Sequence, residues 1–116
     1  MSTSLKQVAA MALALPETEE VPAWEGELTW RVRNKIFVMG APGHPHVTVK
    51  TSPAEQAELT AMDPETYAFA PYVGRFGWTR ITLSRVDSEQ LRELLVEAWR
   101  RTAPKRLVAA FDSAQD

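Results

Sequence analysis

The sequence predicts a two-layer α+β domain, in which an antiparallel sheet is covered by helices on one face. Segments with apolar residues at helical spacing come before, between and after segments of alternating apolar and polar residues. Connections between consecutive strand-like segments are too short for the crossovers that parallel strands need, so antiparallel pairing is expected. The predicted order is α-β-β-β-α-β(-β)-α, in which the bracketed strand is one of two interpretations of a short aromatic segment.

Two helices are expected in the first half of the chain. Ser4 and Gln7 fit a capping box, after which apolar residues recur at helical spacing until a proline ends the pattern. Ser52-Pro53 opens the second helix, because serine caps a helix and proline suits its first position. The apolar side of this second helix is expected at Ala57 and residues 59–62.

The third helix is expected after Asp87, which is a good N-cap. Its apolar stripe consists of Leu91, Leu94, Leu95, Ala98 and Trp99. Pro104 interrupts the pattern, and residues 105–111 continue as a last helical segment. Residues 1–112 are therefore interpreted as a single domain, followed by a polar C-terminal tail at 113–116.

Strands are expected where apolar and polar residues alternate. The clearest segments are 27–33, 36–40, 46–50 and 78–84. A turn is expected at Asn34-Lys35, because asparagine tolerates a positive φ. Residues 19–26 are a further extended segment, which Pro22 confines to an edge or a loop. Residues 67–72 are either a loop or an edge strand.

Composition excludes several classes of function. The 116 residues carry a formal net charge of −2 and no cysteine, which excludes disulfides, thiolate metal sites and a strongly basic nucleic-acid footprint. No apolar run approaches the roughly 20 residues that a membrane-spanning helix needs. The N-terminal segment is interpreted as a helix and not as an export signal. A cytoplasmic protein with no membrane partner and no required cofactor is expected.

The sheet face opposite the helices is the main candidate for binding. Alternation directs the following side chains outward: Thr29, Arg31, Arg33, His46, Thr48, Lys50, Trp78, Arg80 and Thr82. No acidic residue belongs to this set. Lysine and arginine neutralise phosphates, and tryptophan offers a flat surface to an unstacked base. The alternatives are an ordinary half-exposed face, on which arginine and threonine block edge pairing, and a face for protein contacts.

A glycine-containing turn precedes the last strand. Gly74 and Gly77 provide backbone freedom for a turn or a bulge, and Arg75 and Phe76 lie at its tip. A Gly-x-x-Gly loop clamps the nucleic-acid backbone in KH domains, where it joins two helices. Here the loop precedes a strand, so a turn is the simpler interpretation and a grip on a ligand is the alternative.

Other chemistry finds little support in the sequence. His44 and His46 share a strand face, but Pro45 separates them and no third ligand has suitable spacing, so no metal site is predicted. The glutamates within residues 17–27 are interpreted as a solvated acidic loop. Phosphate-binding loops, nucleophile elbows and zinc-protease motifs are missing from the sequence, so an enzyme is not expected.

Aromatic residues are numerous for so small a chain. They include Trp24, Trp30, Phe37, Phe69, Tyr72, Phe76, Trp78 and Trp99. Most are expected in the core, because large rings supply much of the burial that a small domain needs. A few could instead line a groove for a small apolar ligand or a peptide.

A set of short features extends along nearly the whole chain. They are the Leu-Pro-Glu sequence at 15–17, Asn34-Lys35-Ile36-Phe37, Lys50 at the end of a strand, Tyr72, the glycine turn and Trp78. In this order and spacing the chain resembles the MmcQ/YjbR family, small bacterial proteins often labelled DNA-binding. The resemblance implies a YjbR-like antiparallel sheet with helices on one side. It also implies DNA binding through the open sheet face and its loops.

The sequence thus predicts a non-enzymatic binding protein that contacts DNA or another nucleic acid. The expected contact residues are Arg31, Arg33, Lys35, Lys50, Arg75, Trp78 and Arg80. The alternative is a module that binds a protein or a small ligand through the same face or through an aromatic groove. Salt distinguishes these hypotheses, because phosphate contacts weaken steeply as the salt concentration rises.

Overall fold

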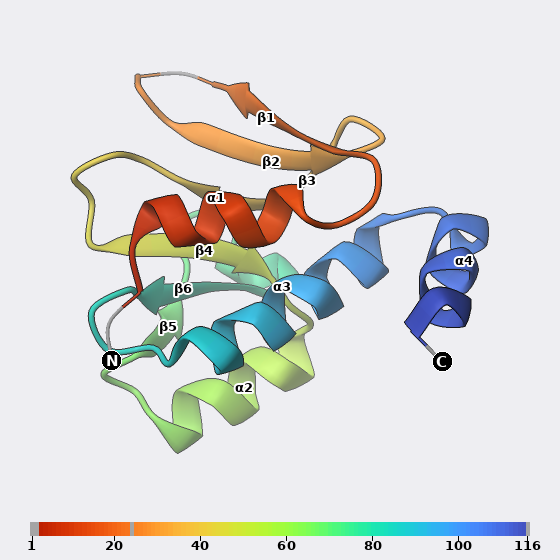
Figure 1. The fold of residues 1–116 in the computed structure, drawn as a ribbon. Helices are drawn as coiled ribbons and strands as arrows, with labels where there is room; N and C mark the ends of the chain where they lie inside the picture. Colours follow the sequence, from red (N-terminus) through yellow and green to blue (C-terminus); the bar gives the residue numbers. More distant parts are fainter. Residues whose placement is uncertain (1–2, 24, 116) are drawn as a thin grey trace.

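One antiparallel sheet organises the computed structural model, which describes residues 3–23 and 25–115 (Figure 1). Within these residues the sheet has six strands: β1 Thr18–Pro22, β2 Leu28–Val32, β3 Lys35–Gly40, β4 His46–Lys50, β5 Tyr67–Phe69 and β6 Trp78–Thr82. Their order across the sheet is β1-β2-β3-β4-β6-β5. Trp24 and the last residue of the predicted tail lie outside the described residues. The predicted α+β class is confirmed, and both segments with two interpretations form edge strands.

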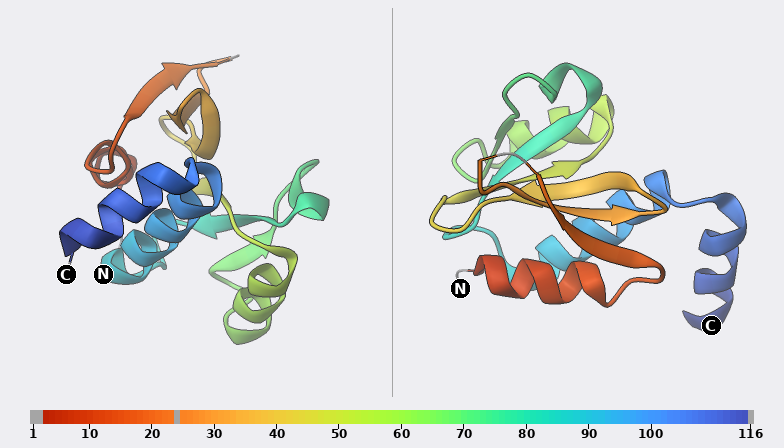
Figure 2. Two further views of the ribbon diagram at one scale, coloured as in Figure 1. Left: turned by 90° about the vertical axis from the view of Figure 1, so that its right-hand side faces the viewer. Right: turned by 90° about the horizontal axis from the view of Figure 1, so that it is seen from above.

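Helices cover one face of this sheet (Figure 2). They are α1 Leu5–Leu13, α2 Pro53–Met62, α3 Ser88–Thr102 and α4 Lys105–Gln115, with a short 3₁₀ helix, η1, at Gly74–Phe76. α3 crosses the central strands β3 and β4, α1 lies beside it next to β1 and β2, and α2 packs near β5 and β6. α4 packs beyond the end of α3, so the opposite face of the sheet is left without helices.

The predicted helix starts are confirmed. The Ser4 side chain accepts a hydrogen bond from the Gln7 backbone N–H, and the Gln7 side chain accepts one from the Ser4 N–H. Ser52 accepts from the backbone N–H of Glu55 before α2, with proline at the first helical position. Asp87 accepts from two backbone N–H groups at the start of α3. Such caps are each worth about 1 kcal/mol.

The core lies between the sheet and α3. Its largest fully buried side chains are Trp30 on β2 and Trp99 on α3. Both indole N–H groups keep a partner: Trp30 donates to the Glu20 carboxylate at 3.1 Å, and Trp99 donates to the Pro16 carbonyl at 3.0 Å. The predicted stripe of α3 is buried in full. Because both polar N–H groups are satisfied, the burial of these large rings carries little polar cost.

A bulge in β3 explains how two adjacent side chains enter the core together. The register with β2 pairs Trp30 with Val38 and Arg31 with Ile36, which leaves Phe37 without a partner. A bulge of this kind interrupts the alternation of side chains between the two faces of a strand. Phe37 and Val38 are consequently both fully buried.

Two local predictions need correction. The turn between β2 and β3 is Arg33-Asn34, with φ of 50° and 68°, and Lys35 already belongs to β3. A two-residue hairpin turn that matches the twist of the strands requires a positive φ at both positions. The inward residues of α2 are Gln56 and Leu59, whereas Ala57 and residues 61–62 are exposed. α2 packs at the margin of the sheet, so only a narrow side of it is covered.

The C-terminal helix is longer than expected. α4 continues through Gln115, so the described residues of the predicted polar tail are helical. The Phe111 ring lies 5.0 Å from that of Trp99, and the Asp112 carboxylate pairs with the Arg100 guanidinium at 2.6 Å. These contacts attach α4 to the end of α3, although no residue of α4 is fully buried.

Candidate nucleic-acid interface on the open sheet face

The open face of the sheet lies opposite α1 and α3 and is bordered by a projecting loop. This loop connects β5 to β6, contains η1 and extends away from the helices (Figure 2). The β1–β2 hairpin curls over the other end of the sheet (Figure 2). The open face therefore lies between this loop and the β1–β2 hairpin.

Cross-strand pairing brings four of the predicted outward residues together. Lys50 pairs with Trp78, and Thr48 pairs with Arg80, between β4 and β6. Directly opposite residues of an antiparallel pair lie on the same face, with Cβ atoms about 4.5–5.5 Å apart. All four side chains are half-buried, so they are accessible on one side only. A cation and an aromatic ring are thus direct neighbours at one end of the β4–β6 pair.

Arg31 also lies on the open face but is already engaged. Its Nε donates to Thr29 Oγ1 at 3.0 Å, and its guanidinium donates to Asn34 Oδ1 at 3.3 Å. The neighbouring strand places Glu19 directly opposite Arg31. Thr29 is fully buried and is not available to a ligand. Sequence analysis found no acid among the outward residues because it did not fix the pairing of β1.

Arg33 and Lys35 do not join this group. Arg33 occupies the β2–β3 turn and forms an ion pair with Glu17, and hydrogen bonding from Arg33 lowers the pKa of the Glu17 carboxyl. Arg33 also lines a hollow with Pro104 at the connection between α3 and α4. Lys35 pairs with Val32, a core residue, so it belongs to the helix-covered side of the sheet. The alternation of β2 ends at Val32, which is why the extrapolation to Arg33 was wrong.

The loop between β5 and β6 presents a basic and aromatic tip. The Arg75 guanidinium lies 4.7 Å from the centre of the Phe76 ring. Phe76 is 61% exposed and Tyr72 is 95% exposed. Tyr72 adopts a φ of 64°, in the left-handed region. A cation and two exposed rings are the groups that contact phosphates and unstacked bases in single-stranded nucleic-acid binders.

Buried polar side chains hold this loop in place. The Gln56 amide on α2 donates to the Gly74 carbonyl at 2.9 Å and to the Trp78 carbonyl at 2.7 Å. Thr51 contributes both its backbone N–H and its hydroxyl to the Gly77 carbonyl. Sequence analysis missed Gln56, because a single polar residue in an amphipathic pattern does not reveal that it faces inward.

Two adjoining hollows lie between the loop and the sheet, and we call them together the open-face cleft. Both are lined by Glu27, Met39, Thr48 and Pro71. The first has a volume of about 210 Å³ and is also lined by Gly40, Ala41, His44, His46 and Arg80. The second has a volume of about 290 Å³ and is completed by Tyr72 and Val73. Among its lining residues, the sequence had singled out His44, His46, Thr48, Tyr72 and Arg80 as candidate or family-pattern residues, whereas Glu27 had been interpreted as part of a solvated acidic loop.

One acid and two imidazoles line the cleft: Glu27, His44 and His46. Burial lowers the pKa of His46, and the nearby Arg80 and His44 lower it further. His46 is therefore neutral near pH 7 and offers both a donor and an acceptor nitrogen. Glu27 faces the same space from the start of β2. Within residues 3–23 and 25–115, no group of three His, Cys, Asp or Glu side chains is placed to hold a metal ion.

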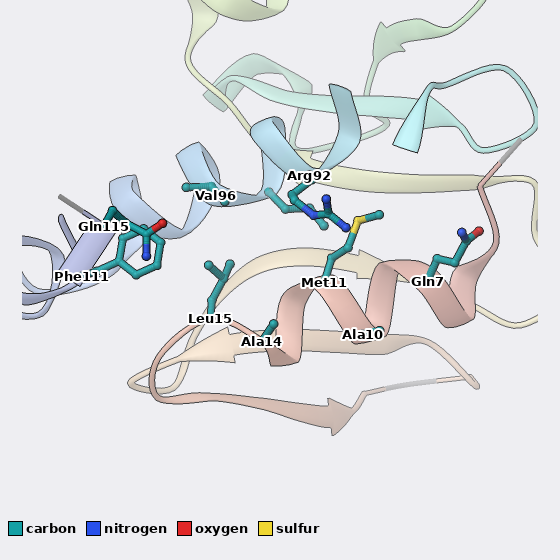
Figure 3. A pocket seen from close by; sticks show the side chains of 10 residues that line it. Gln7, Ala10, Met11, Ala14, Leu15, Arg92, Val96, Phe111 and Gln115 are labelled. Carbon is teal, nitrogen blue, oxygen red and sulfur yellow. The ribbon is translucent and has the colours of Figure 1, made fainter. Parts of the chain in front are cut away.

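A second, apolar groove lies on the helix side of the molecule (Figure 3). It has a volume of about 410 Å³ and runs between α1, α3 and α4. Met11 and Leu15 line it from the α1 side, Val96 from α3 and Phe111 from α4. Only one ring, that of Phe111, contributes to it, and none of the aromatic residues considered in the sequence lines this groove. In the part of the chain that the structure describes, no helix is both long and apolar enough to span a membrane.

Comparison with known proteins assigns the family. Residues 13–101 match the model of the YjbR family. The chain belongs to the YjbR family. Uncharacterised proteins of Mycobacterium bovis and Mycobacterium tuberculosis are each 32% identical to it over 92 residues, which covers 77% of this chain and 71% of the relative. The matched YjbR region extends from the end of α1 to the end of α3 and includes the whole sheet.

A solved structure supports the same fold. The crystal structure of a Deinococcus radiodurans protein, described as a DUF419 domain, superposes with a TM-score of 0.76 at 21% sequence identity. The superposition covers 85% of this YjbR chain and 77% of the other chain. At this level of identity the likeness establishes a shared fold and nothing about a shared ligand.

Proposed function

We propose that this YjbR-family chain is a non-enzymatic, cytoplasmic protein that binds nucleic acid through its open sheet face. The observation that carries the proposal is the cross-strand pairing of Lys50 with Trp78, next to that of Thr48 with Arg80. Two cations beside one ring can neutralise adjacent phosphates while a base packs on the indole. The loop carrying Arg75 extends this surface away from the sheet.

The distribution of charge supports the central strands as the contact region. The chain has 15 acidic against 13 basic residues, so attraction to a polyanion must come from a local surface. Glu89 and Glu93 lie on α3, on the far side of the sheet. On the open face, Glu19 opposes Arg31 near the β1 edge. Lys50 and Arg80 lie away from this edge, on β4 and β6, and form the stronger part of the surface.

The test is a binding titration with a charge-matched control. Fluorescence anisotropy would follow labelled single- and double-stranded DNA and RNA at about 50 mM and about 200 mM salt. The test variant combines Lys50→Ala and Arg80→Ala. The control combines Lys105→Ala and Arg106→Ala, which remove two exposed cations from α4. Both variants carry the same net charge, so general electrostatic attraction is equal.

The expected result is salt-sensitive binding by the wild type and by the control, with a large loss in the Lys50 and Arg80 variant. Each lost phosphate contact should reduce the salt slope by about 1. Absence of binding to every nucleic acid at the lower salt concentration would refute the proposal. An equal loss of affinity in the control and the test variant would show that the open face is not the contact surface.

The helix-side groove favours a second candidate function, the binding of a small apolar ligand. Its walls are mainly apolar, as in most small-molecule sites. Its volume of about 410 Å³ lies within the range of about 300–1,000 Å³ that is typical of such sites. Binding there would be nearly independent of salt and insensitive to the Lys50 and Arg80 changes. The test is to compare the affinity of a fluorescent apolar probe for the wild type and for Met11→Trp, in which the larger side chain fills the groove. Weaker binding by the variant would support this alternative, and equal binding would contradict it.

A further inference from the structure

We propose that the open-face cleft accepts the base of one unstacked nucleotide, so that the preferred ligand is single-stranded and its bound base carries an amino group. This inference rests on the proposed nucleic-acid binding and specifies its ligand. It follows from three properties of the cleft: its size, the chemistry of its walls and the position of its single acid. The size selects against duplex DNA, and the walls and the acid specify the base.

The size of the cleft matches a small planar group. Its two hollows, of about 210 and 290 Å³, each lie below the range of about 300–1,000 Å³ found for drug-sized ligands. They adjoin along four shared lining residues. One hollow can hold a base while the other holds part of its sugar. A base within a duplex is stacked and paired, and cannot enter such a space without flipping out.

The walls combine apolar surfaces with a few polar groups. Met39 on β3 and Pro71 in the loop line both hollows, and the exposed Tyr72 ring closes the second. These groups can pack against the flat faces of a base. Thr48 and the neutral His46 can donate to or accept from its polar edge. This combination is the usual one for a nucleobase pocket, in which apolar faces hold the ring and polar groups read its edge.

The position of Glu27 indicates the orientation and the type of base. A carboxylate repels phosphate. The part of the ligand that contacts Glu27 must therefore be a cation or a hydrogen-bond donor. Carboxylates accept hydrogen bonds from the amino group of cytosine, whereas thymine presents a carbonyl oxygen at the same place. We therefore place the base amino group toward Glu27 and the phosphates toward Arg80, which lines the first hollow, and toward Lys50 on the same strand as Thr48.

The experiment compares base preference and strandedness in one set of titrations. Fluorescein-labelled oligodeoxycytidine, oligodeoxythymidine and a mixed-sequence duplex of equal length would be titrated with the wild type, Glu27→Gln and Glu25→Gln. Glu25 is an exposed acid near Glu27 that does not line the cleft. Either change removes one negative charge, so both should strengthen binding in general. Only Glu27→Gln should alter the ratio of the affinities for cytosine and thymine.

The expected result is that the wild type binds oligodeoxycytidine about fivefold or more tightly than oligodeoxythymidine, and both more tightly than duplex. Glu27→Gln should abolish this preference, and Glu25→Gln should keep it. Thr48→Phe, which fills the cleft, should reduce single-strand affinity toward that for duplex, with the thermal unfolding temperature checked for each variant. Equal affinities for all three ligands, unchanged by Glu27→Gln, would overturn the inference and leave the proposed function intact. No binding to any ligand would overturn both.

Discussion

Gly77 occupies a backbone conformation that other residues adopt only under strain. Its φ is 97°, and a Cβ atom added there would lie 2.9 Å from the carbonyl oxygen of Thr51. The backbone of Thr51 is also held against Gly77, because the Thr51 N–H and hydroxyl both donate to the Gly77 carbonyl. Backbone atoms cannot move away as a flexible side chain can. The junction between the loop and β6 therefore requires glycine for two separate reasons.

We expect Gly77→Ala to destabilise the protein by about 1–3 kcal/mol from the positive φ alone, with an additional cost from the close contact. Gly43→Ala is the matched control, because Gly43 has a φ of 82° but nothing within 4 Å of an added Cβ. Urea denaturation followed by tryptophan fluorescence would measure both free energies of unfolding. Equal losses in the two variants would show that the contact with Thr51 is unimportant.

Asp63 ends α2 and has an acid-sensitive environment. Its carboxylate accepts a hydrogen bond from the Thr66 hydroxyl at 2.6 Å, and the Arg85 guanidinium lies 3.9 Å away. The hydrogen bond from Thr66, followed by the attraction of Arg85, lowers the Asp63 pKa below its ordinary value of 3.8. The folded state consequently binds its proton less readily than the unfolded state does.

The sign of the pH dependence follows from this lowered pKa. The stabilisation by ionised Asp63 is complete above pH 3.8 and is lost as the pH falls through the lower value of the folded state. Asp63→Asn should thus destabilise the protein near neutral pH, and its difference from the wild type should shrink on acidification. Urea titrations across this pH range would measure the difference, with the exposed Glu58→Gln on the same helix as control. A difference independent of pH would contradict the assignment.

Residue-scale prediction from the sequence succeeded where a pattern was complete and failed at its boundary. The alternation within β4 correctly directed Val47 and Val49 inward. The alternation of β2 was extended by one residue to Arg33, although the turn begins there. Residue types alone do not show where a hairpin reverses, because several positions tolerate a positive φ.

At the scale of elements, α2 holds the loop that borders the open-face cleft in position. Gln56 is buried, and its amide reaches two backbone carbonyls on either side of Gly77. These carbonyls belong to η1 and to the start of β6. The loop therefore depends on α2 for its position, although β5 separates the two segments in the sequence.

Gln56→Leu should destabilise the protein by about 1–3 kcal/mol, because it removes two hydrogen bonds to the Gly74 and Trp78 carbonyls. These carbonyls then keep only the backbone N–H groups of Gly77 and Ala70 as donors. The loop should also open more often, since its attachment to α2 is lost. Limited trypsin digestion would detect faster cleavage after Arg75, which is already exposed. Glu58→Leu provides the control for an added leucine on the exposed side of α2. Unchanged cleavage in Gln56→Leu would show that the loop is held by other contacts.

Helices α1, α2 and α3 were predictable because each carries its own local start signal. The side-chain caps at Ser4, Ser52 and Asp87 act on neighbouring backbone groups and need no tertiary context. The pairing of β1 with β2 and the bulge at Phe37 depend on register, which is set by distant neighbours. The cleft depends on that register as well, which is why Glu27 and Met39 were missed as its lining.

At the scale of the whole molecule, the fold separates a covered face from an open one. Helix α3 packs on the covered side of the central strands, and the projecting loop lies on the other side (Figure 2). The covered face carries the core and the acidic exposed side of α3. The open face carries Lys50, Trp78 and Arg80 within a continuous strand pair. The two-layer class predicted from the sequence made an open face certain, but only the register showed which cations share it.

This arrangement sets an upper limit on the salt dependence of binding. Four cations lie on the open face or its loop: Arg31, Lys50, Arg75 and Arg80. If all four neutralise phosphates of a single strand, the logarithm of the binding constant should fall against the logarithm of salt concentration with a slope of about −3, from roughly −0.7 per contact. The whole chain has 13 lysine and arginine residues, so unspecific contact over its surface would allow a much steeper slope.

A salt series with single-stranded DNA would measure this slope directly. Because Arg31 is engaged by Thr29, Asn34 and the opposing Glu19, we expect its contribution to be small and the observed slope to be nearer −2 than −3. Arg31→Ala should then change the slope little, whereas Arg80→Ala should flatten it by about 0.7, the contribution of one contact to a single strand. A slope much steeper than −3, unaffected by Arg80→Ala, would place the contact on another surface of the molecule.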